Sequence, residues 1–203
     1  MGVSPSIQRE KLPTLKPHWP PEQGQWTYKD WLQLPDDGYR YEVIDRVLYM
    51  TPPPSVLHQR VSLQLVRKLA EFVEQHDLGE VLQAPIGVRL PHQPTPLQPD
   101  ILFICTERLD IIGDVYIEGA PDLVMEILSP GNWLYDCREK KQVYQQGGVA
   151  EYWIIDPRTE TIQVHQLERE GYALLGQHGA GERVQSPGLP GFEVLVDEVF
   201  QAR

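Results

Sequence analysis

Two acidic residues stand in or beside short apolar runs, where an ionised side chain is costly. Asp100 opens the run ILFIC, and Glu126 lies inside VMEIL. Such runs predict buried strands, in which a carboxylate needs a cationic partner or a metal ion. Mg²⁺ prefers hard oxygen ligands and takes only one or two carboxylates from a protein. Because bound Mg²⁺ polarises a phosphate and lowers the pKa of an attacking water, the pair indicates a phosphodiester-cleaving site.

Two further charged residues could complete such a site. Asp136, Lys140 and Tyr144 follow one another at intervals of four residues, so they lie near one helix face. A lysine on that face could enter the acidic cluster, orient the attacking water and stabilise the charge on the phosphate. Lys141 stands beside Lys140, and the spacing does not decide between them. Glu42, in an aromatic and β-branched stretch, could supply a third acid.

Each candidate also has a purely structural interpretation. The two strand acids could cap strand ends or pair with arginines. The lysine could form an exposed helical ion pair with Asp136, which contributes only a few tenths of a kcal/mol. Glu42 could face solvent on an alternating strand. His58, at the start of a helix, could contact a phosphate or carry a proton, but a histidine there is more often structural.

Other chemistries find no supporting pattern. The six histidines form no HExxH or HxH motif, and the chain has no GxSxG elbow and no Walker loop. The two cysteines, Cys105 and Cys137, lack metal-type spacing and suit a reducing compartment. Neither a secretory signal nor a membrane-length apolar stretch is visible, so we expect a cytoplasmic protein with no membrane partner.

The length of 203 residues predicts one folded domain. Residues 1–25 contain five prolines and no apolar periodicity, which predicts a flexible arm before a single domain over residues 26–203. The net charge of −11 argues against generic nucleic-acid binding, which relies on Lys and Arg. A bound metal ion could reverse the potential locally.

The elements that must position these residues alternate between helices and strands. A short helix should begin at Thr27, with Asp30 completing a capping box. Tyr39–Met50 reads as a hairpin, although Arg46 is a poor residue for its tight turn. The clearest helix has Val61, Leu65, Leu69 and Phe72 on one face, broadened by Leu63, Val66 and Val73, and should stop at Gly79.

The second half of the chain is mostly strand-like. A second helix is expected over Asp136–Gln146, ending at Gly147-Gly148. The predicted strands are Glu80–Leu90, Asp100–Cys105, Leu123–Leu128, Glu151–Ile155, Thr161–Leu167, Tyr172–Leu175 and Phe192–Val196. This order predicts an α/β (α+β) fold, with a mixed sheet and a helix on each side.

Several sequence blocks together resemble the Uma-type restriction-endonuclease family, a branch of the PD-(D/E)XK nuclease superfamily. The resemblance covers roughly residues 26–200. The blocks are YRYEVIDRVLYM, His58-Gln59, Gln98-Pro99-Asp100-Ile101, PDLVMEILSP, Asp136 with Lys140 and Tyr144, and GVAEYWIIDP, in that order. The resemblance implies a restriction-endonuclease-like core, in which a central mixed sheet is flanked by helices and carries acids at one end.

The resemblance also implies roles for individual residues. Asp100 and Glu126 match the metal-binding acids, and Glu42 matches an additional acid. The superfamily usually carries its lysine two residues after the second acid, where this chain has Leu128. Lys140 falls on the helix position where this branch carries its lysine, as if the catalytic residue had migrated. Arg46 also departs from the branch, in which glycine is common at that turn.

These observations lead to one principal hypothesis and two alternatives. The principal hypothesis is a Mg²⁺-dependent endonuclease, with Mn²⁺ possible, that acts on DNA as a homodimer. A nuclease-like fold retained as a non-catalytic interaction or regulatory module is the first alternative, motivated by the acidic charge. The second is a metal-dependent phosphohydrolase that uses the same acids on a small nucleotide.

Overall fold

A six-stranded mixed sheet forms the centre of the protein. The computed structural model describes residues 19–129 and 135–201. In spatial order the strands are β10 (Gly171–His178), β9 (Thr161–Glu168), β8 (Glu151–Asp156), β7 (Leu123–Ile127), β5 (Ile101–Cys105) and β3 (Gly79–Gln83). Only β7 and β8 pair in parallel, while the other four neighbouring pairs are antiparallel. The structure therefore confirms the predicted mixed sheet.

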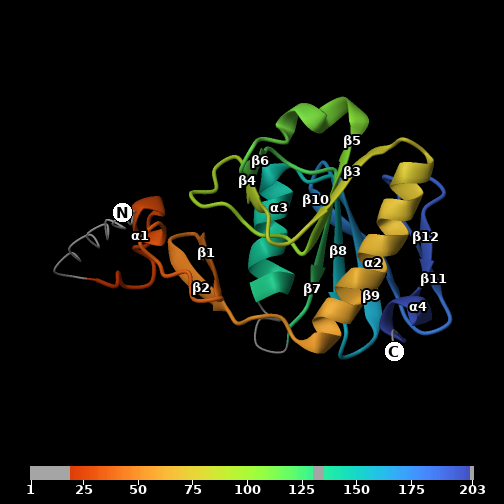
Figure 1. Ribbon diagram of the computed structural model, residues 1–203, viewed down its shortest axis with the longest axis horizontal. Helices are drawn as coiled ribbons and strands as arrows, with labels where there is room; N and C mark the ends of the chain where they lie inside the picture. The colour runs from red at the N-terminus through yellow and green to blue at the C-terminus, as the bar shows by residue number, and fades with distance from the viewer. Residues whose placement is uncertain (1–18, 130–134, 202–203) are drawn as a thin grey trace, which may run out of the picture.

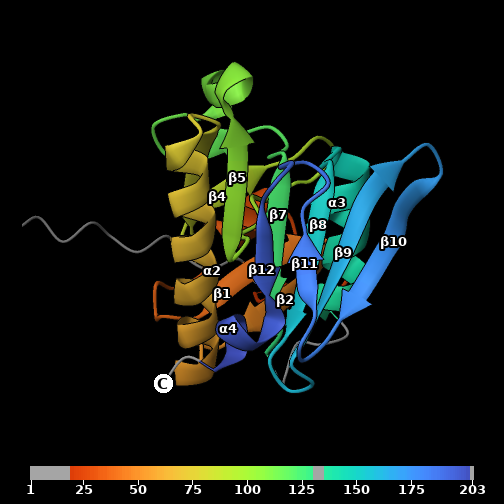
Figure 2. The ribbon, with the colours of Figure 1, turned by 90° about the vertical axis from the view of Figure 1, so that its right-hand side faces the viewer.

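Helices and small sheets cover both faces of this sheet (Figures 1 and 2). One face carries α2 (Val56–Gln75), α4 (Val196–Phe200) and the hairpin of β11 (Arg183–Gln185) and β12 (Glu193–Leu195). The opposite face carries α3 (Lys141–Gly147), the pair β4 (Gly87–Arg89) and β6 (Tyr116–Glu118), and the hairpin of β1 (Arg40–Ile44) and β2 (Val47–Thr51). The remaining elements are α1 (Tyr28–Trp31), η1 (Thr106–Ile111) and the π-helical turn η2 (Tyr135–Lys140).

Apolar side chains on both faces explain why the central strands read as continuous hydrophobic runs. On β5, Ile101 and Phe103 belong to the core beneath α2, whereas Leu102 and Ile104 belong to the core beneath α3. A strand buried on both faces has no polar alternation. Trp153 on β8 is fully buried in the α2-side core, as expected for a sheet-core residue.

The amphipathic helix α2 was predicted in its core face but not in its limits. Val61, Leu65 and Leu69 are buried as expected, and the Ser55 side chain caps the first turn. Leu63 does not broaden the buried face, because it is 55% exposed. The prediction that the helix stops at Gly79 was wrong: α2 ends at Gln75, and Gly79 opens β3 with a φ of +146°.

The β1–β2 hairpin turns on two residues with left-handed backbone. Asp45 and Arg46 have φ values of 49° and 65°, the geometry of a primed turn, so the hairpin prediction is confirmed. The Arg46 carbonyl accepts hydrogen bonds from the backbone of Gly24 and Trp26. Residues just before the predicted domain therefore line the hairpin, whereas residues 1–18 of the proposed flexible arm lie outside the described residues.

The remaining predictions were confirmed in part. The predicted capping box of Thr27 and Asp30 is present at α1. The strand expected over Glu80–Leu90 is split into β3 and β4, because Pro85 lies between them and has no backbone N–H to donate to a neighbouring strand. The short elements β6, β11, η1 and α4 carry no strong sequence pattern and were missed. Within the described residues, no helix combines the length and apolar character needed to cross a membrane.

Candidate active site

The pairing of β5 with β7 brings the two strand acids together. The antiparallel register pairs Ile101 with Met125, and continuing it by one residue places Asp100 opposite Glu126. Ile101 and Met125 face α2, so alternation turns Glu126 toward Lys140 and Tyr144 on the opposite face. Asp100 stands just before β5, and its carboxylate contacts the backbone of Ile127, the residue after Glu126. The two acids therefore lie at the same end of the sheet.

Asp100 is buried among hydrogen-bond donors. Its Oδ1 accepts a hydrogen bond from Arg40 Nη1 at 3.2 Å, and its Oδ2 accepts one from the Ile127 backbone at 2.8 Å. His58 Nε2 lies 3.1 Å from the same Oδ2. Burial alone would raise the pKa of Asp100, but the His58 hydrogen bond and the charges of Arg40, His58 and Lys140 lower it to about 2. The Asp100 carboxylate is therefore ionised.

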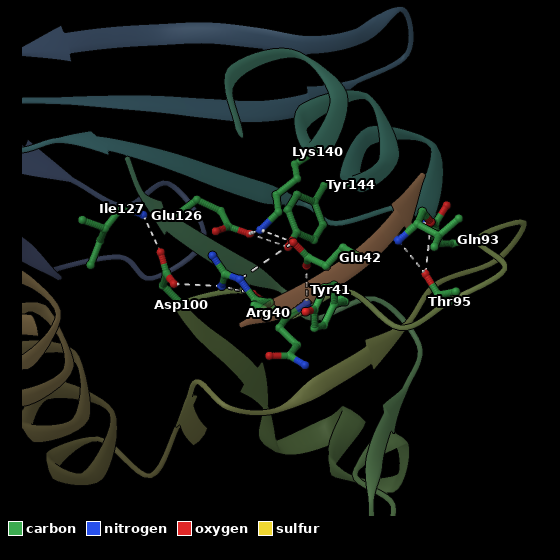
Figure 3. Close-up of polar contacts among 12 residues, drawn as sticks. Arg40, Tyr41, Glu42, Gln93, Thr95, Asp100, Glu126, Ile127, Lys140 and Tyr144 are labelled. Carbon is green, nitrogen blue, oxygen red and sulfur yellow. Dashed lines mark hydrogen bonds and ion pairs between the residues drawn. The ribbon is translucent and has the colours of Figure 1, made fainter. Parts of the chain in front are cut away.

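Glu126 on β7 has its cationic partner, Lys140, on a different element. Its Oε1 accepts hydrogen bonds from Lys140 Nζ at 2.9 Å and from the Tyr144 hydroxyl at 2.7 Å (Figure 3). Lys140 Nζ also lies 3.3 Å from Glu42 Oε2. Lys140 is 0% exposed, and both glutamates are 1% exposed. Burial, followed by the charges of Glu126 and Glu42, raises the pKa of Tyr144 well above its usual value, so its hydroxyl remains a donor.

The hairpin contributes two charged residues from one strand face. Arg40 and Glu42 are two residues apart on β1, so their side chains point the same way. Glu42 Oε1 accepts a hydrogen bond from the Gln98 backbone at 2.8 Å, and Arg40 Nη1 donates one to the Gln98 carbonyl at 2.7 Å. Arg40 Nε lies 3.9 Å from Glu42 Oε2. These contacts fix the hairpin against the segment that leads into β5.

The charges of the site alternate in sign along a chain of contacts. The order is Asp100, Arg40, Glu42, Lys140 and Glu126, with a formal sum of −1 from three acids and two permanent cations. Each buried carboxylate thus has a neighbouring cation, without which its burial would be strongly unfavourable. Figure 3 shows these side chains converging from β1, β7, the residue before β5 and the end of η2.

An irregular helix start delivers Lys140 to the acids. The helix expected from Asp136 begins instead with the π-helical turn η2, and α3 follows from Lys141. A π-turn changes which side chains share a face, and such turns are frequent at functional sites. The structure brings Lys140 to the acids, while Lys141 is only half-buried. The side chain of Asp136 lies outside the described part of the structure. Gly148 ends the helix with a φ of 86°, as its sequence predicted.

Sequence reasoning missed or underrated three residues that contact these acids. Arg40 was detectable in principle, because a residue two positions from Glu42 on a strand must share its face. Tyr144 was placed on the face of Lys140 but given no role, and it donates to Glu126. His58 was interpreted as more often structural, yet it contacts Asp100 directly. The solvent-facing interpretation of Glu42 and the exposed-pair interpretation of Lys140 were both wrong, since both side chains are buried.

A cleft of about 460 Å³ opens beside Asp100, and we call it the Asp100 cleft. Its walls come from the hairpin, the proline segment 52–54, the first turns of α2 and the loop after β3. The polar groups lining it include Arg40, His58, Gln59, Gln83, Gln98 and Asp100. A ligand in this cleft would therefore meet amides, a guanidinium, an imidazole and the carboxylates of Asp36 and Asp100.

The donor set fits a hard divalent cation. Across residues 19–129 and 135–201, no group of three or more His, Cys, Asp or Glu side chains is arranged so that it could hold a metal ion. Asp100 and Glu126 nevertheless carry carboxylates at the same end of β5 and β7, and Mg²⁺ needs only one or two such ligands. Arg40 and Lys140 lie on these same carboxylates and would have to share them with an incoming cation.

Comparisons with known proteins agree with this architecture. The sequence model of the Uma2 family, described as "Putative restriction endonuclease", matches residues 28–197. Five chains of solved structure are similar, among them the crystal structure of "a putative nuclease belonging to DUF820" from Anabaena variabilis ATCC 29413. That structure aligns with a TM-score of 0.71 at 19% identity, over 86% of this chain and 97% of that chain, which shows a shared fold. No curated protein matches this chain.

Proposed function

Because the chain belongs to the Uma2 family, we propose that it is a Mg²⁺-dependent endonuclease that hydrolyses phosphodiester bonds in DNA. The observation that supports this most is that Asp100 accepts a hydrogen bond from the backbone of Ile127, the residue after Glu126, while Lys140 Nζ lies 2.9 Å from Glu126. In this proposal these three residues are catalytic, and Glu42 assists them.

Each residue has a role that follows from its contacts. Asp100 and Glu126 would hold the cation, Mg²⁺ or Mn²⁺, which polarises the phosphate and lowers the pKa of the attacking water. Lys140 Nζ, already positioned by two carboxylates, would orient that water and stabilise charge on the phosphate. Tyr144 holds Glu126 Oε1 in place, and Arg40 keeps Asp100 beside the cleft.

A second candidate is a non-catalytic interaction or regulatory module. The alternating ion-pair chain favours it, because Arg40 and Lys140 already compensate the acids without a metal. The two candidates differ in cation affinity. An endonuclease should bind Mn²⁺ at the acids with an affinity that Glu126→Gln lowers by at least tenfold, whereas the module should bind Mn²⁺ no better than that variant.

Nicking of supercoiled plasmid in Mg²⁺ or Mn²⁺ tests the endonuclease proposal. Asp100→Asn keeps the shape of the side chain but removes its charge, so we expect at least a 100-fold lower rate. Asp114→Asn is the matched control, because Asp114 is exposed, and its rate should equal that of the wild type. Equal rates for the wild type and Asp100→Asn would refute the proposal.

The neighbouring lysines provide a second comparison. Lys140→Met should abolish nicking, whereas Lys141→Met should retain most of it, because Lys140 Nζ donates a hydrogen bond to Glu126 and Lys141 is half-buried. Loss of Lys140 also leaves buried carboxylates uncompensated, at a cost of about 3–5 kcal/mol in the free energy of unfolding. Urea unfolding therefore accompanies the assay, and Lys140→Arg provides a folded variant that keeps the charge. Similar losses in both Met variants would contradict the assignment.

A further inference from the structure

A second, smaller pocket lies directly beside the Asp100 cleft. It measures about 300 Å³ and is bounded by the first turn of α2, the end of β7 and the turn between β8 and β9. We call it the Leu57 pocket, after the leucine that α2 contributes to its wall. It lies beyond the carboxyl ends of the parallel strands β7 and β8, where ligands of α/β proteins commonly bind.

The two hollows share part of their lining. His58 and Ser129 border both the Leu57 pocket and the Asp100 cleft. His58 Nε2 is 3.1 Å from Asp100 Oδ2, so the shared wall lies one side chain away from the proposed cation ligand. A molecule whose phosphate lies at Asp100 could therefore place its next group in the Leu57 pocket.

The lining of the Leu57 pocket suits a partly apolar group of the size of a nucleobase. Leu57, Leu128 and Pro157 supply apolar surface, while Asp156 and Arg158 supply polar groups. The Asp156 carboxylate accepts a hydrogen bond from the Arg158 backbone at 2.9 Å, and its other oxygen lies 3.6 Å from the guanidinium. Enzymes that take up an unpaired base hold it between apolar side chains and hydrogen-bond its edge. A volume near 300 Å³ accommodates such a group but not a base pair within a duplex.

The charge of the protein also favours a ligand held by more than phosphate contacts. With a net charge of −11, the chain as a whole repels a polyanion. Contacts to the face of a base are independent of counterion release and insensitive to sequence. A base-sized pocket beside the proposed catalytic centre would supply affinity that cationic side chains do not.

We propose that the Leu57 pocket binds an unpaired nucleobase next to the bond that is cut. The substrate would then be single-stranded or locally unpaired DNA. This inference rests on the proposed function for the identity of the ligand, and it adds the strandedness of the substrate.

Binding without cleavage tests the inference. The probes are a single-stranded oligonucleotide carrying 2-aminopurine and its blunt duplex, titrated with the full chain in EDTA and followed by fluorescence anisotropy. We expect the single strand to bind at least tenfold more tightly than the duplex. Leu57→Glu replaces the apolar wall with a carboxylate and should reduce this ratio to near one.

A matched variant separates loss of the pocket from added negative charge. Leu63→Glu makes the same change on the same helix at a leucine that is 55% exposed and lies outside both hollows, so the ratio should stay at the wild-type value. Equal affinities for single strand and duplex, or an unchanged ratio in Leu57→Glu, would overturn the inference.

The nicking assay makes the two proposals separable. A protein that cuts duplex plasmid and binds both probes equally would refute the pocket assignment and leave the endonuclease standing. A protein that prefers the single strand through Leu57 but cuts neither the plasmid nor the single-stranded oligonucleotide in Mg²⁺ or Mn²⁺ would support the pocket and refute the endonuclease.

Discussion

Lys140 reaches Glu126 from a helix, although the superfamily that the sequence resembles usually carries its lysine on the strand itself. The strand position, Leu128, is buried in the apolar core beneath α3. The π-helical turn that ends at Lys140 places its amino group 2.9 Å from Glu126 instead. The same cation–carboxylate contact is thus obtained from a different element, which leaves the end of β7 free to pack.

A buried histidine away from the site should make stability depend on pH. His165 on β9 is 2% exposed, its Nδ1 has no hydrogen-bond partner, and its ring lies near Tyr152 and Tyr172. Burial, together with the charge of Lys141, lowers its pKa from 6.5 to about 4. Because the unfolded chain then binds more protons between these values, stability should fall as pH drops from about 6.5 to 4 and level off above 6.5.

His165→Phe removes this titration while preserving an aromatic ring. Over that pH interval the variant should lose about 2–3 kcal/mol less unfolding free energy than the wild type, since each pKa unit corresponds to about 1.4 kcal/mol. Urea unfolding at several pH values measures the difference. His92→Asn, at an exposed histidine, should follow the wild-type curve. Parallel curves for the wild type and His165→Phe would rule out this source of pH dependence.

At the scale of elements, helices and strands were predicted correctly where a long apolar repeat or run had to be buried. The face of α2 and the run that forms β5 are of this kind. Limits and interruptions depended on local backbone features that periodicity does not report, as at Pro85 and the η2 turn. Leu63 was wrongly predicted to be buried, because helical periodicity does not show where the buried face of a helix ends and its solvent-exposed face begins.

The β1–β2 turn offers a prediction at this scale. Arg46 has a φ of 65°, a conformation that costs a residue with a side chain roughly 1–2 kcal/mol and costs glycine little. A glycine at this position would relieve that cost, but part of the gain in stability is offset because glycine has more conformational freedom in the unfolded chain. Arg46→Gly should therefore raise the free energy of unfolding by about 0.5–1 kcal/mol, measured as a higher urea midpoint.

An ordinary turn provides the comparison. Arg169 joins β9 to β10 without a left-handed φ, so Arg169→Gly should lower the urea midpoint. If both glycine variants shifted the midpoint in the same direction, relief of backbone strain at Arg46 would not be the cause.

At the scale of the whole molecule, the site unites a hairpin, two sheet strands and two helices that lie far apart in the chain. The sequence marked four of its charged residues, because buried acids and an out-of-place lysine are conspicuous. It could not assign their partners, since the Arg40–Asp100 contact spans sixty residues and depends on how the hairpin docks. The docking is set by tertiary contacts, such as those of Thr95 with the Val43 backbone.

The overall charge leads to a prediction about salt. Among the described residues, Arg40 and Arg158 are the only permanent cations lining the Asp100 cleft and the Leu57 pocket. Two phosphate contacts on a single strand give a slope of about −1.4 in a plot of log affinity against log salt. Affinity should therefore fall by less than about tenfold between 50 and 200 mM salt, whereas six to ten contacts would cost about 10³–10⁵. Anisotropy titrations of the single-stranded probe measure this slope.

Arg158→Gln should reduce the magnitude of the salt slope by about 0.7. Arg183→Gln, on β11 and outside both hollows, should leave the slope unchanged. A slope several times steeper would mean that phosphate contacts, and not the base pocket, provide the affinity.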